Sequence, residues 1–578
     1  MEISLSTAAW ILFAIIMIAW YVHDKYVQRD HQLLVNYPII GRLRYVFEEA
    51  REPFRQYFGD EKFYESKDKL DWVYKAASDA PNYASFSPSQ PLPKPKFMIR
   101  HANIVLNDDE VDDKFEVIFG AKRKKPYIAK SIVSRSAMSD GSISPEGTRA
   151  FVRGAQMGDF PINSGEGGLT SNFFVTHQSY KPEYMKIVHG TQFKKKIKDL
   201  VDLFFNGAMA ADVYRSLVFK KDPEAETYVF DLKSQLFHRV NWDAPLEDFP
   251  EEVPEDMADI ILQLSSGLYG ARDKNGNFDP DRYQKTMRFC KMTEIKIAQG
   301  AKQTGGKLTA HKVTPAIAYY RNVEANKDVF SPNRFPYANS IEELFDFIGK
   351  LQGLSEKPVG VKIVISDLEN IEPYVKEIKK RIDEGNDKYP DFISIDGGSG
   401  GSATAPIEMM ERVGLNIKDS IFLADKVLRD YGIREEVKLV ASGKILTPDD
   451  IIITMALGAD FVQIARGFMM SAGCIRARYC SGTTGHDCPV GLATQNKSKR
   501  KKYFVYKQAK KVTNYHNNLL KSVRGLLAIM GLKNINQLNK HRILFLDKDS
   551  RVHDNMDAVF SRRLDIGKDL GDEYHESR

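Results

Sequence analysis

The stretch FISIDGGSGG occupies residues 392–401, and two stretches of the same kind follow it: VKLVASGK at 437–444 and FVQIARG at 461–467. Each is a short apolar run that ends in a glycine-containing turn. Short apolar runs that alternate with amphipathic stretches are typical of βα units. Glycine leaves backbone N–H groups accessible in such turns, and loops at these positions of parallel barrels bind phosphate. Together the three turns favour a ligand that carries a phosphate group.

Eight runs in all can be interpreted as β-strands. Eight strands with helices between them predict a (β/α)₈ TIM barrel of the α/β class. A doubly wound open sheet is the structural alternative, because the second and third runs are weak strand signals. In chain order the runs are Ile132–Ala137, Phe160–Asn163, Gln263–Tyr269, Thr293–Ala298, Val359–Ile365, Phe392–Asp396, Val437–Ser442 and Phe461–Ala465.

The N-terminus contains an uncharged stretch, LSTAAWILFAIIMIAWYV at 5–22, which is long enough to span a bilayer as a helix. Trp20 and Tyr21 at its end are typical of a membrane interface. A retained anchor is favoured over a cleaved signal peptide and over a buried core helix. Basic residues follow the stretch, including Lys25 and Arg42, so the positive-inside rule predicts a single-pass membrane protein with a cytoplasmic catalytic domain.

The expected domain organisation has four parts: an anchor at 1–23, a helical and loop region at 24–125, the barrel at 126–515, and a C-terminal helical extension and tail at 516–578. Within the barrel, residues 171–256 are too long for an ordinary connection and are predicted to form a helical insertion.

Composition narrows the class of protein further. There are 83 basic and 77 acidic residues, and this small excess argues against a nucleic-acid-binding protein. The basic runs at 121–125 and 497–502 are expected to be solvated loop surface, and the alternative is contact with anionic lipid or an acidic electron carrier.

Three of the four cysteines, Cys474, Cys480 and Cys488, follow the eighth run with the spacing C-x5-C-x7-C. Three thiolates suit an incomplete iron–sulfur cube, or zinc together with His486. Three ordinary free cysteines are the simpler alternative.

Polar residues also occur at the ends of predicted strands. In EIKIAQGAK at 294–302, Lys296 alternates toward the barrel interior, where a lysine is costly unless an anion pairs with it. A reduced flavin would be such an anion. Glu166 lies in the glycine-rich stretch NSGEGG at 163–168, which follows the second predicted strand.

Taken together, these motifs resemble the FMN-binding synthase domain of glutamate synthase, in its stand-alone, membrane-anchored form without a glutaminase domain. The resemblance covers about 130–170 and 257–515, and the motifs occur in the family's order. They are SAMS (136–139), NSGEGG (163–168), QLSSGLYG (263–270), EIKIAQGAK (294–302), GGKLTAHKV (305–313), DFISIDGGSGGSATAP (391–406), ASGK (441–444), ARGFM (465–469), GCIRARYC (473–480) and CPVGLATQ (488–495).

The resemblance implies reductive amination of 2-oxoglutarate by ammonia, through 2-iminoglutarate, to L-glutamate. It implies FMN and a 3Fe–4S cluster as cofactors, and the cluster ligands would be Cys474, Cys480 and Cys488. Glu166 would lie near the incoming ammonia, and Lys302 and Lys312 would bind the substrate carboxylates. The flavin would contact Ala137, Met138, Ser139, Gln263 and Lys296 at its ring and Gly397, Gly398, Gly443, Ala465, Arg466 and Gly467 at its phosphate.

The sequence also departs from the family pattern. The usual cysteine spacing is x5 then x4, whereas here it is x5 then x7. No glutaminase segment or dinucleotide-binding βαβ fingerprint is seen, so ammonia is expected from solution or a separate glutaminase subunit, and electrons from a ferredoxin-like or other donor protein. The alternatives are a related flavin and iron–sulfur barrel that acts on another 2-oxo acid or amine, such as one forming N-alkylglutamate, and a non-catalytic membrane-tethered scaffold.

Overall fold

The computed structural model separates into two compact units, Met1–Lys67 and Asp68–Arg578. The residues that it describes are 5–27, 34, 37–43, 46–47, 66–83, 94–174, 185–187, 203–204, 228–231, 236–240, 249, 252–254, 257–300, 302, 305–406, 408–410, 412–481, 486–500 and 503–564.

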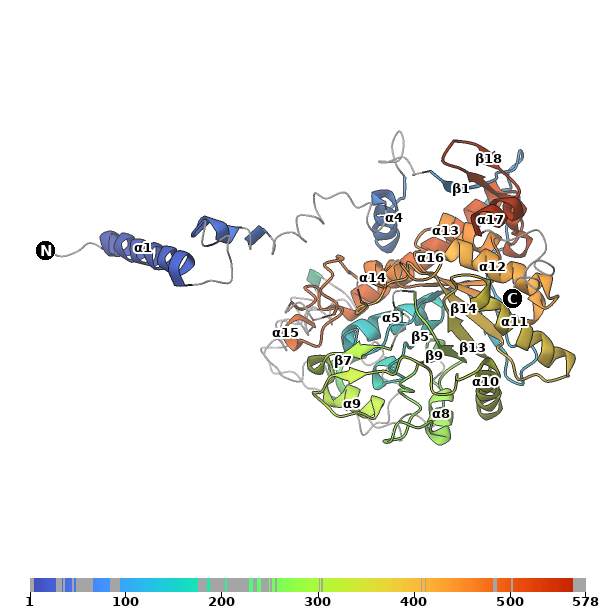
Figure 1. Cartoon of the computed structure of the whole chain (residues 1–578), viewed down its shortest axis with the longest axis horizontal. Helices are drawn as coiled ribbons and strands as arrows, with labels where there is room; N and C mark the ends of the chain where they lie inside the picture. Colours follow the sequence, from blue (N-terminus) through green and yellow to red (C-terminus); the bar gives the residue numbers. More distant parts are fainter. Residues whose placement is uncertain are drawn as a thin grey trace. The chain divides into compact units, whose positions relative to one another are not determined.

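The second unit is built on a closed barrel of eight parallel strands in the order β10-β13-β14-β15-β16-β4-β5-β9 (Figure 1). The predicted barrel is thereby confirmed, and the open-sheet alternative is wrong because β9 pairs with β10 and closes the sheet. The strands are β4 (Val133–Arg135), β5 (Ile162–Asn163), β9 (Ile260–Leu264), β10 (Met292–Lys296), β13 (Val359–Ile363), β14 (Phe392–Asp396), β15 (Lys438–Ser442) and β16 (Phe461–Ile464).

All eight predicted runs coincide with or overlap a barrel strand. The third was placed too late in the chain, at Gln263–Tyr269, whereas β9 spans Ile260–Leu264. The residues after β9 form a turn, in which Leu268 has a positive φ of 52°. Their apolar character reflects burial of the turn and not extended structure, since Leu268 and Tyr269 are both buried.

Helices surround the barrel, and the long helix α16 packs along α5 (Figure 1). Apolar residues repeat along one face of these helices and are buried against the strands. The helices of this unit are α4 (Lys67–Ala77), α5 (Pro145–Gly158), α8 (Pro280–Met287), α9 (Pro315–Arg321), α10 (Ile341–Ser355), α11 (Leu368–Asp383), α12 (Ile417–Asp430), α13 (Pro448–Ala456), α14 (Arg466–Ser471), α15 (Lys497–Arg500), α16 (Val505–Ile529) and α17 (Met556–Leu564).

The antiparallel hairpin of β2 (Val117–Phe119) and β3 (Tyr127–Ala129) covers the N-terminal end of the barrel. Phe119 is fully buried there against Phe392 and Phe461, the first residues of β14 and β16, with ring centroids 5.5 and 5.3 Å apart. This end of the barrel is therefore packed with aromatic side chains, and the opposite end remains for a ligand.

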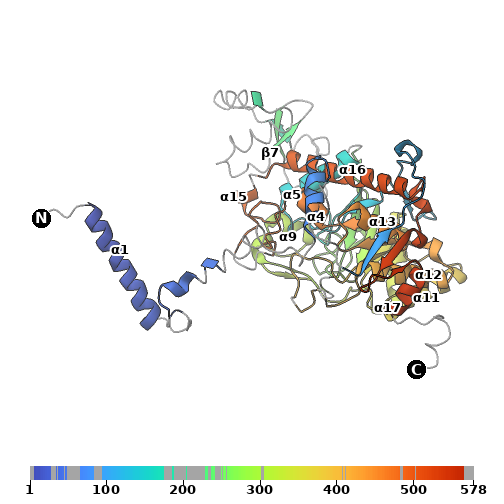
Figure 2. The same ribbon diagram turned by 90° about the horizontal axis from the view of Figure 1, so that it is seen from above.

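Smaller sheets lie outside the barrel. β1 (Lys96–Ile99) pairs with β17 (Ile543–Leu546), which also pairs with β18 (Val552–His553) beside α17 (Figure 2). β11 (Lys307–Leu308) pairs with β12 (Val329–Phe330). Strand β1 is thus held to the C-terminal extension by main-chain hydrogen bonds.

The predicted insertion at 171–256 is described only in part. It contains an antiparallel sheet of β6 (Met185–Ile187), β8 (Leu236–Val240) and β7 (Tyr228–Asp231), which the helical pattern did not predict. The helical stretch predicted at 193–217 lies outside the described residues, except for two positions.

The first unit contains helix α1 (Leu5–Val22), which coincides with the uncharged stretch. Among the described residues one helical segment, Trp10–Val27, is long and apolar enough to cross a membrane, with a mean hydropathy of 1.3. After α1 the buried Asp24 accepts hydrogen bonds from Ile39 N at 3.1 Å and Arg42 Nε at 2.8 Å. This ties the segment 37–42 back to the end of the helix.

The lysines of the basic run at 121–125 are exposed, as expected of a solvated loop, but they also form ion pairs. The Arg123 side chain is only 8% exposed and donates to Asp391 at 2.8 Å and to Asp387 at 3.1 Å. Lys124 and Lys125 both pair with Glu356. The run therefore fastens the loop after β2 to the barrel, which leaves it few free charges for a lipid or protein partner.

Candidate functional site

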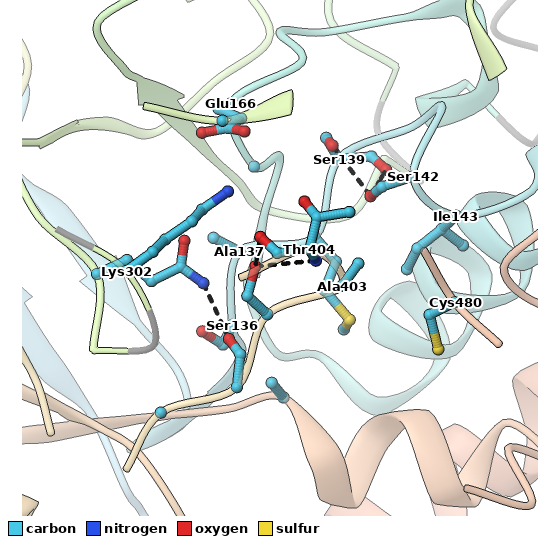
Figure 3. A pocket seen from close by; sticks show the side chains of 18 of the residues that line it. Ser136, Ala137, Ser139, Ser142, Ile143, Glu166, Lys302, Ala403, Thr404 and Cys480 are labelled. Atoms are coloured by element: carbon cyan, nitrogen blue, oxygen red, sulfur yellow. Dashed lines mark hydrogen bonds between the residues drawn. The ribbon is translucent and has the colours of Figure 1, made fainter. Parts of the chain in front are cut away.

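A cavity of about 340 Å³ opens at the carboxyl ends of the barrel strands. Its walls come from the segments that follow β4, β5, β10, β14, β15 and β16, so it collects side chains from positions far apart in the sequence. Figure 3 shows Glu166 and Lys302 on one side of this cavity and Cys480 on another, with Ala137 between them. This is the end of a TIM barrel at which ligands bind.

The cavity is strongly basic. Among the residues that the structure describes, two acidic ones line it, Glu166 and Asp396. The basic residues among the described lining are Lys296, Lys302, Lys307, Lys312, Arg321, Lys362, Lys444 and Arg466. Because charges in a poorly hydrated cavity are costly unless compensated, this excess indicates a ligand or ligands with several negative charges.

Lys296 at the end of β10 forms an ion pair with Glu166 across the cavity wall. Burial opposes ionisation of Glu166, but Lys296, Lys302 and Arg321 outweigh it and lower its pKa to about 2. Glu166 is therefore a carboxylate throughout the neutral range. The sequence prediction that Lys296 needs an anionic partner is met by Glu166 within the chain itself.

Lys302 is buried, and its burial lowers its pKa although Glu166 acts in the opposite direction. A Cβ built on Gly306 would lie 2.8 Å from Glu166 Oε1 and 3.4 Å from Lys302 Nζ, so the two groups meet over this glycine. The structure thus brings together three of the predicted site residues: Glu166, Lys296 and Lys302.

Arg321, which the sequence analysis missed, lies in the same part of the cavity. It is the last residue of α9 and is 3% exposed. Its Nη2 donates to Asp140 O at 3.2 Å and to Ser139 Oγ at 3.4 Å, and its Nε has no hydrogen-bond partner among the described atoms. An arginine at a helix C-terminus normally faces solvent, and no local pattern indicated its burial.

Lys362 was also missed, although the alternation argument that singled out Lys296 applies to it. It occupies the position on β13 that pairs with Lys296 on β10. It is 4% exposed and lies 3.8 Å from Asp396 at the end of β14. Its position inside the predicted strand Val359–Ile365 could have identified Lys362 as a candidate site residue.

Lys312 lies elsewhere in the cavity, against the cysteine segment. Its Nζ donates to the main-chain carbonyl oxygens of Cys480 at 2.6 Å and Ala493 at 3.3 Å, and lies 3.5 Å from Ser142 O. The structure does not bring Lys312 to Lys302, so the two predicted carboxylate ligands occupy different regions.

Most residues expected to contact the flavin line the cavity: Ala137, Met138, Ser139, Gln263, Lys296, Gly443, Ala465 and Arg466. Gly397, Gly398 and Gly467 are not among the lining residues. A Cβ at Gly467 would lie 1.9 Å from Tyr515 Oη, so the start of α14 needs glycine there to pack against α16. The glycine turns therefore serve close packing as well as the cavity.

Two of the three clustered cysteines, Cys474 and Cys480, line the cavity, and Cys480 and Cys488 lie close enough to Lys312 to act on it electrostatically. Burial raises the pKa of Cys474 to about 12 and also raises that of Cys480. Tyr479, just before Cys480, makes a ring contact with His486, between Cys480 and Cys488, with centroids 5.0 Å apart. In the described part of the chain no three His, Cys, Asp or Glu residues gather closely enough to hold a metal ion. The structure therefore does not show the predicted cluster site.

Comparison with known proteins gives a match over most of the chain. The family model described as the conserved region in glutamate synthase matches residues 76–533. The glutamate synthase large subunit-like protein YerD of Bacillus subtilis is 29% identical, over 94% of this chain and 95% of that protein. The archaeal-type glutamate synthase (NADPH) of Thermotoga neapolitana is 31% identical over 51% of this chain, which spans about half of that protein, 54%.

Among solved structures, a mandelate oxidase mutant with the monooxide FMN adduct is similar with a TM-score of 0.37 and 12% identity. The match covers 86% of this chain and 99% of that one.

Proposed function

Because the chain belongs to the family that carries the conserved region of glutamate synthase, we propose that it is an FMN-dependent, glutamate synthase-like oxidoreductase. The proposed reaction is the reductive amination of 2-oxoglutarate by ammonia to L-glutamate, through 2-iminoglutarate. The observation that carries the proposal is the excess of basic over acidic residues in the barrel cavity, at the strand ends where this family's motifs converge. The family alone does not fix the substrate, and the basic cavity supports a dianion.

The residues present fit an FMN. Ser442 at the end of β15, Gly443 and Lys444 after it and Arg466 after β16 line one part of the cavity. These turns supply N–H groups and positive charge for a phosphate. Gln263 and the backbone of 137–139 line another part, where they would hold the ring. When bound, FMN supplies the hydride that reduces the imine.

Two buried cations suit the carboxylates of 2-oxoglutarate. Arg321 and Lys302 both act electrostatically on Glu166. An arginine with an unpartnered Nε can bind a carboxylate with two parallel hydrogen bonds. In this arrangement Arg321 and Lys302 orient the substrate, and Lys296, which lines the same cavity, would supply positive charge to a bound flavin.

Glu166 acts as an anchor and not as a strong base. With its pKa lowered to about 2, it does not readily take a proton from ammonium. A carboxylate accepts hydrogen bonds only, so it can hold incoming ammonia or the imine nitrogen by their N–H groups. It also holds Lys296 in place.

The remaining elements of the proposal concern partners. Electrons come from a ferredoxin-like or other donor protein, and a separate glutaminase subunit is a candidate source of ammonia. Helix α1 anchors the chain to a membrane, with the barrel in the cytoplasm. The clustering of Cys474, Cys480 and Cys488 after the last barrel strand supports an iron–sulfur cluster, although their spacing departs from that of the family.

The experiment is anaerobic purification followed by quantification of flavin, iron and sulfide, and by an assay with chemically reduced enzyme. The expected result is bound FMN and formation of L-glutamate from 2-oxoglutarate and ammonium. A panel with methylamine in place of ammonium, and with shorter 2-oxo acids, distinguishes N-alkylglutamate synthesis and other substrates. Folded protein that binds no flavin would overturn the proposal and favour the scaffold alternative.

A further inference from the structure

Glu294 lies inside the barrel beneath the cavity and is completely buried. It projects from β10 and accepts four hydrogen bonds from the side chains of four other strands. Oε1 accepts from Asn163 Nδ2 at 2.8 Å and Gln263 Nε2 at 2.7 Å. Oε2 accepts from Ser394 Oγ at 2.5 Å and Gln463 Nε2 at 3.3 Å. All four donors are uncharged, so the carboxylate is stabilised by hydrogen bonds and not by an ion pair with any of them.

Two of these donors, Gln263 and Gln463, also line the cavity. A side-chain amide has an NH₂ group with two N–H donors and a carbonyl oxygen that accepts. Because each glutamine turns its NH₂ group toward Glu294, its Oε1 atom lies on the other side of the amide and is the acceptor that it can offer a ligand. Gln463 Oε1 is buried and has no hydrogen-bond partner among the described atoms, which is costly unless a ligand supplies a donor.

We propose that Glu294 is a positioning residue that fixes the orientation of the Gln263 and Gln463 amides, so that the cavity floor presents hydrogen-bond acceptors to an N–H group of the flavin ring. This inference rests on the proposed function. Oxidised isoalloxazine carries one ring N–H, at N3, and the acceptor floor therefore selects for that edge.

The position of Glu294 explains why an acid is needed there. A glutamine at 294 would itself present an NH₂ group on one side. The neighbouring amide on that side would have to turn its carbonyl oxygen toward position 294 and its NH₂ toward the cavity. The cavity floor would then present both hydrogen-bond donors and acceptors, although the side-chain volume at position 294 would change little.

The test measures binding of FMN and of 3-methyl-FMN, whose N3 carries no hydrogen, to apo-protein by quenching of flavin fluorescence. The wild-type protein is expected to prefer FMN by about tenfold or more, as loss of a buried hydrogen bond predicts. Glu294→Gln is expected to reduce this preference to about threefold or less.

Ser394→Ala is the matched control. It removes one donor to the same carboxylate but leaves both amides oriented as they are, and the preference for FMN should remain. If Glu294→Gln does not fold, as judged by circular dichroism, Gln463→Met removes one acceptor directly and should reduce the preference in the same way.

Equal affinity of the wild-type protein for the two flavins would overturn this inference and leave the proposed function standing. An unchanged preference in Glu294→Gln, or in Gln463→Met if that variant is used, would overturn it too. If the folded wild-type protein binds neither flavin, the proposed function fails and this inference fails with it.

Discussion

Lys312 Nζ lies 2.6 Å from the main-chain carbonyl oxygen of Cys480, at a distance typical of a strong charge-assisted hydrogen bond. A second hydrogen bond, to Ala493 O, joins the same amine to the other end of the cysteine segment. The lysine thus connects the short turn at Ala310–Lys312 to residues more than 160 positions later in the chain. Its geometry is that of a clamp on the cysteine segment.

Replacing Lys312 with methionine should therefore loosen the cysteine segment. The carbonyl oxygens would lose their donor, and we expect destabilisation of roughly 2–3 kcal/mol. Thermal unfolding and hydrogen exchange of residues 474–481 and 486–493 measure this. Lys307→Met is the control, because Lys307 also lines the cavity but pairs with the half-exposed Asp328. Equal effects of the two substitutions would contradict the clamp.

Arg321 is expected to determine the affinity for the substrate. Arg321→Met removes a buried guanidinium, and the KM for 2-oxoglutarate should rise about ten- to a hundredfold, with the content of bound flavin unchanged. Arg321→Lys should restore little of this, because an ammonium group does not bind a carboxylate with two parallel hydrogen bonds.

Arg272→Met is the matched control for Arg321. Both guanidinium groups lie over the ring of Tyr269, at 5.7 Å for Arg272 and 5.2 Å for Arg321, but Arg272 does not line the cavity. The KM of Arg272→Met for 2-oxoglutarate should stay close to that of the wild-type protein. A KM that rises equally in both variants would show that Tyr269 packing, and not the charge of Arg321, is responsible.

Arg123 is expected to stabilise the fold and to have no role in partner binding. Arg123→Ala leaves the buried carboxylate of Asp391 without its cation and should lower the free energy of unfolding by about 3 kcal/mol. Lys124→Ala, at an exposed position in the same run, should have no measurable effect. Urea unfolding of the two variants checks this. Similar urea midpoints for the two variants would mean that the buried ion pair contributes no measurable stability.

His516 predicts a pH dependence of stability. It is buried against Phe160, its Nε2 lies 2.8 Å from Ser131 Oγ, and burial lowers its pKa from 6.5 to about 4. The unfolded chain therefore binds the proton more tightly than the folded protein. The stability that neutral His516 contributes is complete above pH 6.5 and is lost as the pH falls toward about 4, by about 3 kcal/mol.

Unfolding of the wild-type protein and of His516→Gln should be compared at about pH 7 and about pH 4.5. The difference in stability between the two proteins should shrink or change sign at the lower pH. A difference that is the same at both values would place the pKa of His516 near its usual value in the folded protein.

The barrel was predictable because its strands are buried on both faces and read as continuous apolar runs. Glu166 and Lys296 were predictable because each lies within or just after a strand, where its direction follows from the pleat and the turn. Lys302 was identified through the family resemblance. Gln263 was also singled out, but its partner Glu294 was not, since a carboxylate inside a barrel has no distinct local pattern.

Lys312 and Arg321 show where such reasoning ends. Both lie in the segment after β10, and their positions depend on how a long loop and a short helix fold back onto other loops. Lys312 contacts residues near 480 and 493, and Arg321 contacts Asp140. Contacts at these separations are set by tertiary packing, and neither charge nor spacing in the local sequence encodes them.

Phe119, Phe392 and Phe461 pack together at the N-terminal end of the barrel, and the cavity opens at the other end of the described barrel. A ligand that enters the cavity from this end also leaves from this end. The product must therefore leave the cavity through the same opening before the next substrate can bind. We therefore expect product inhibition that is competitive with the substrate, whatever reaction the site catalyses.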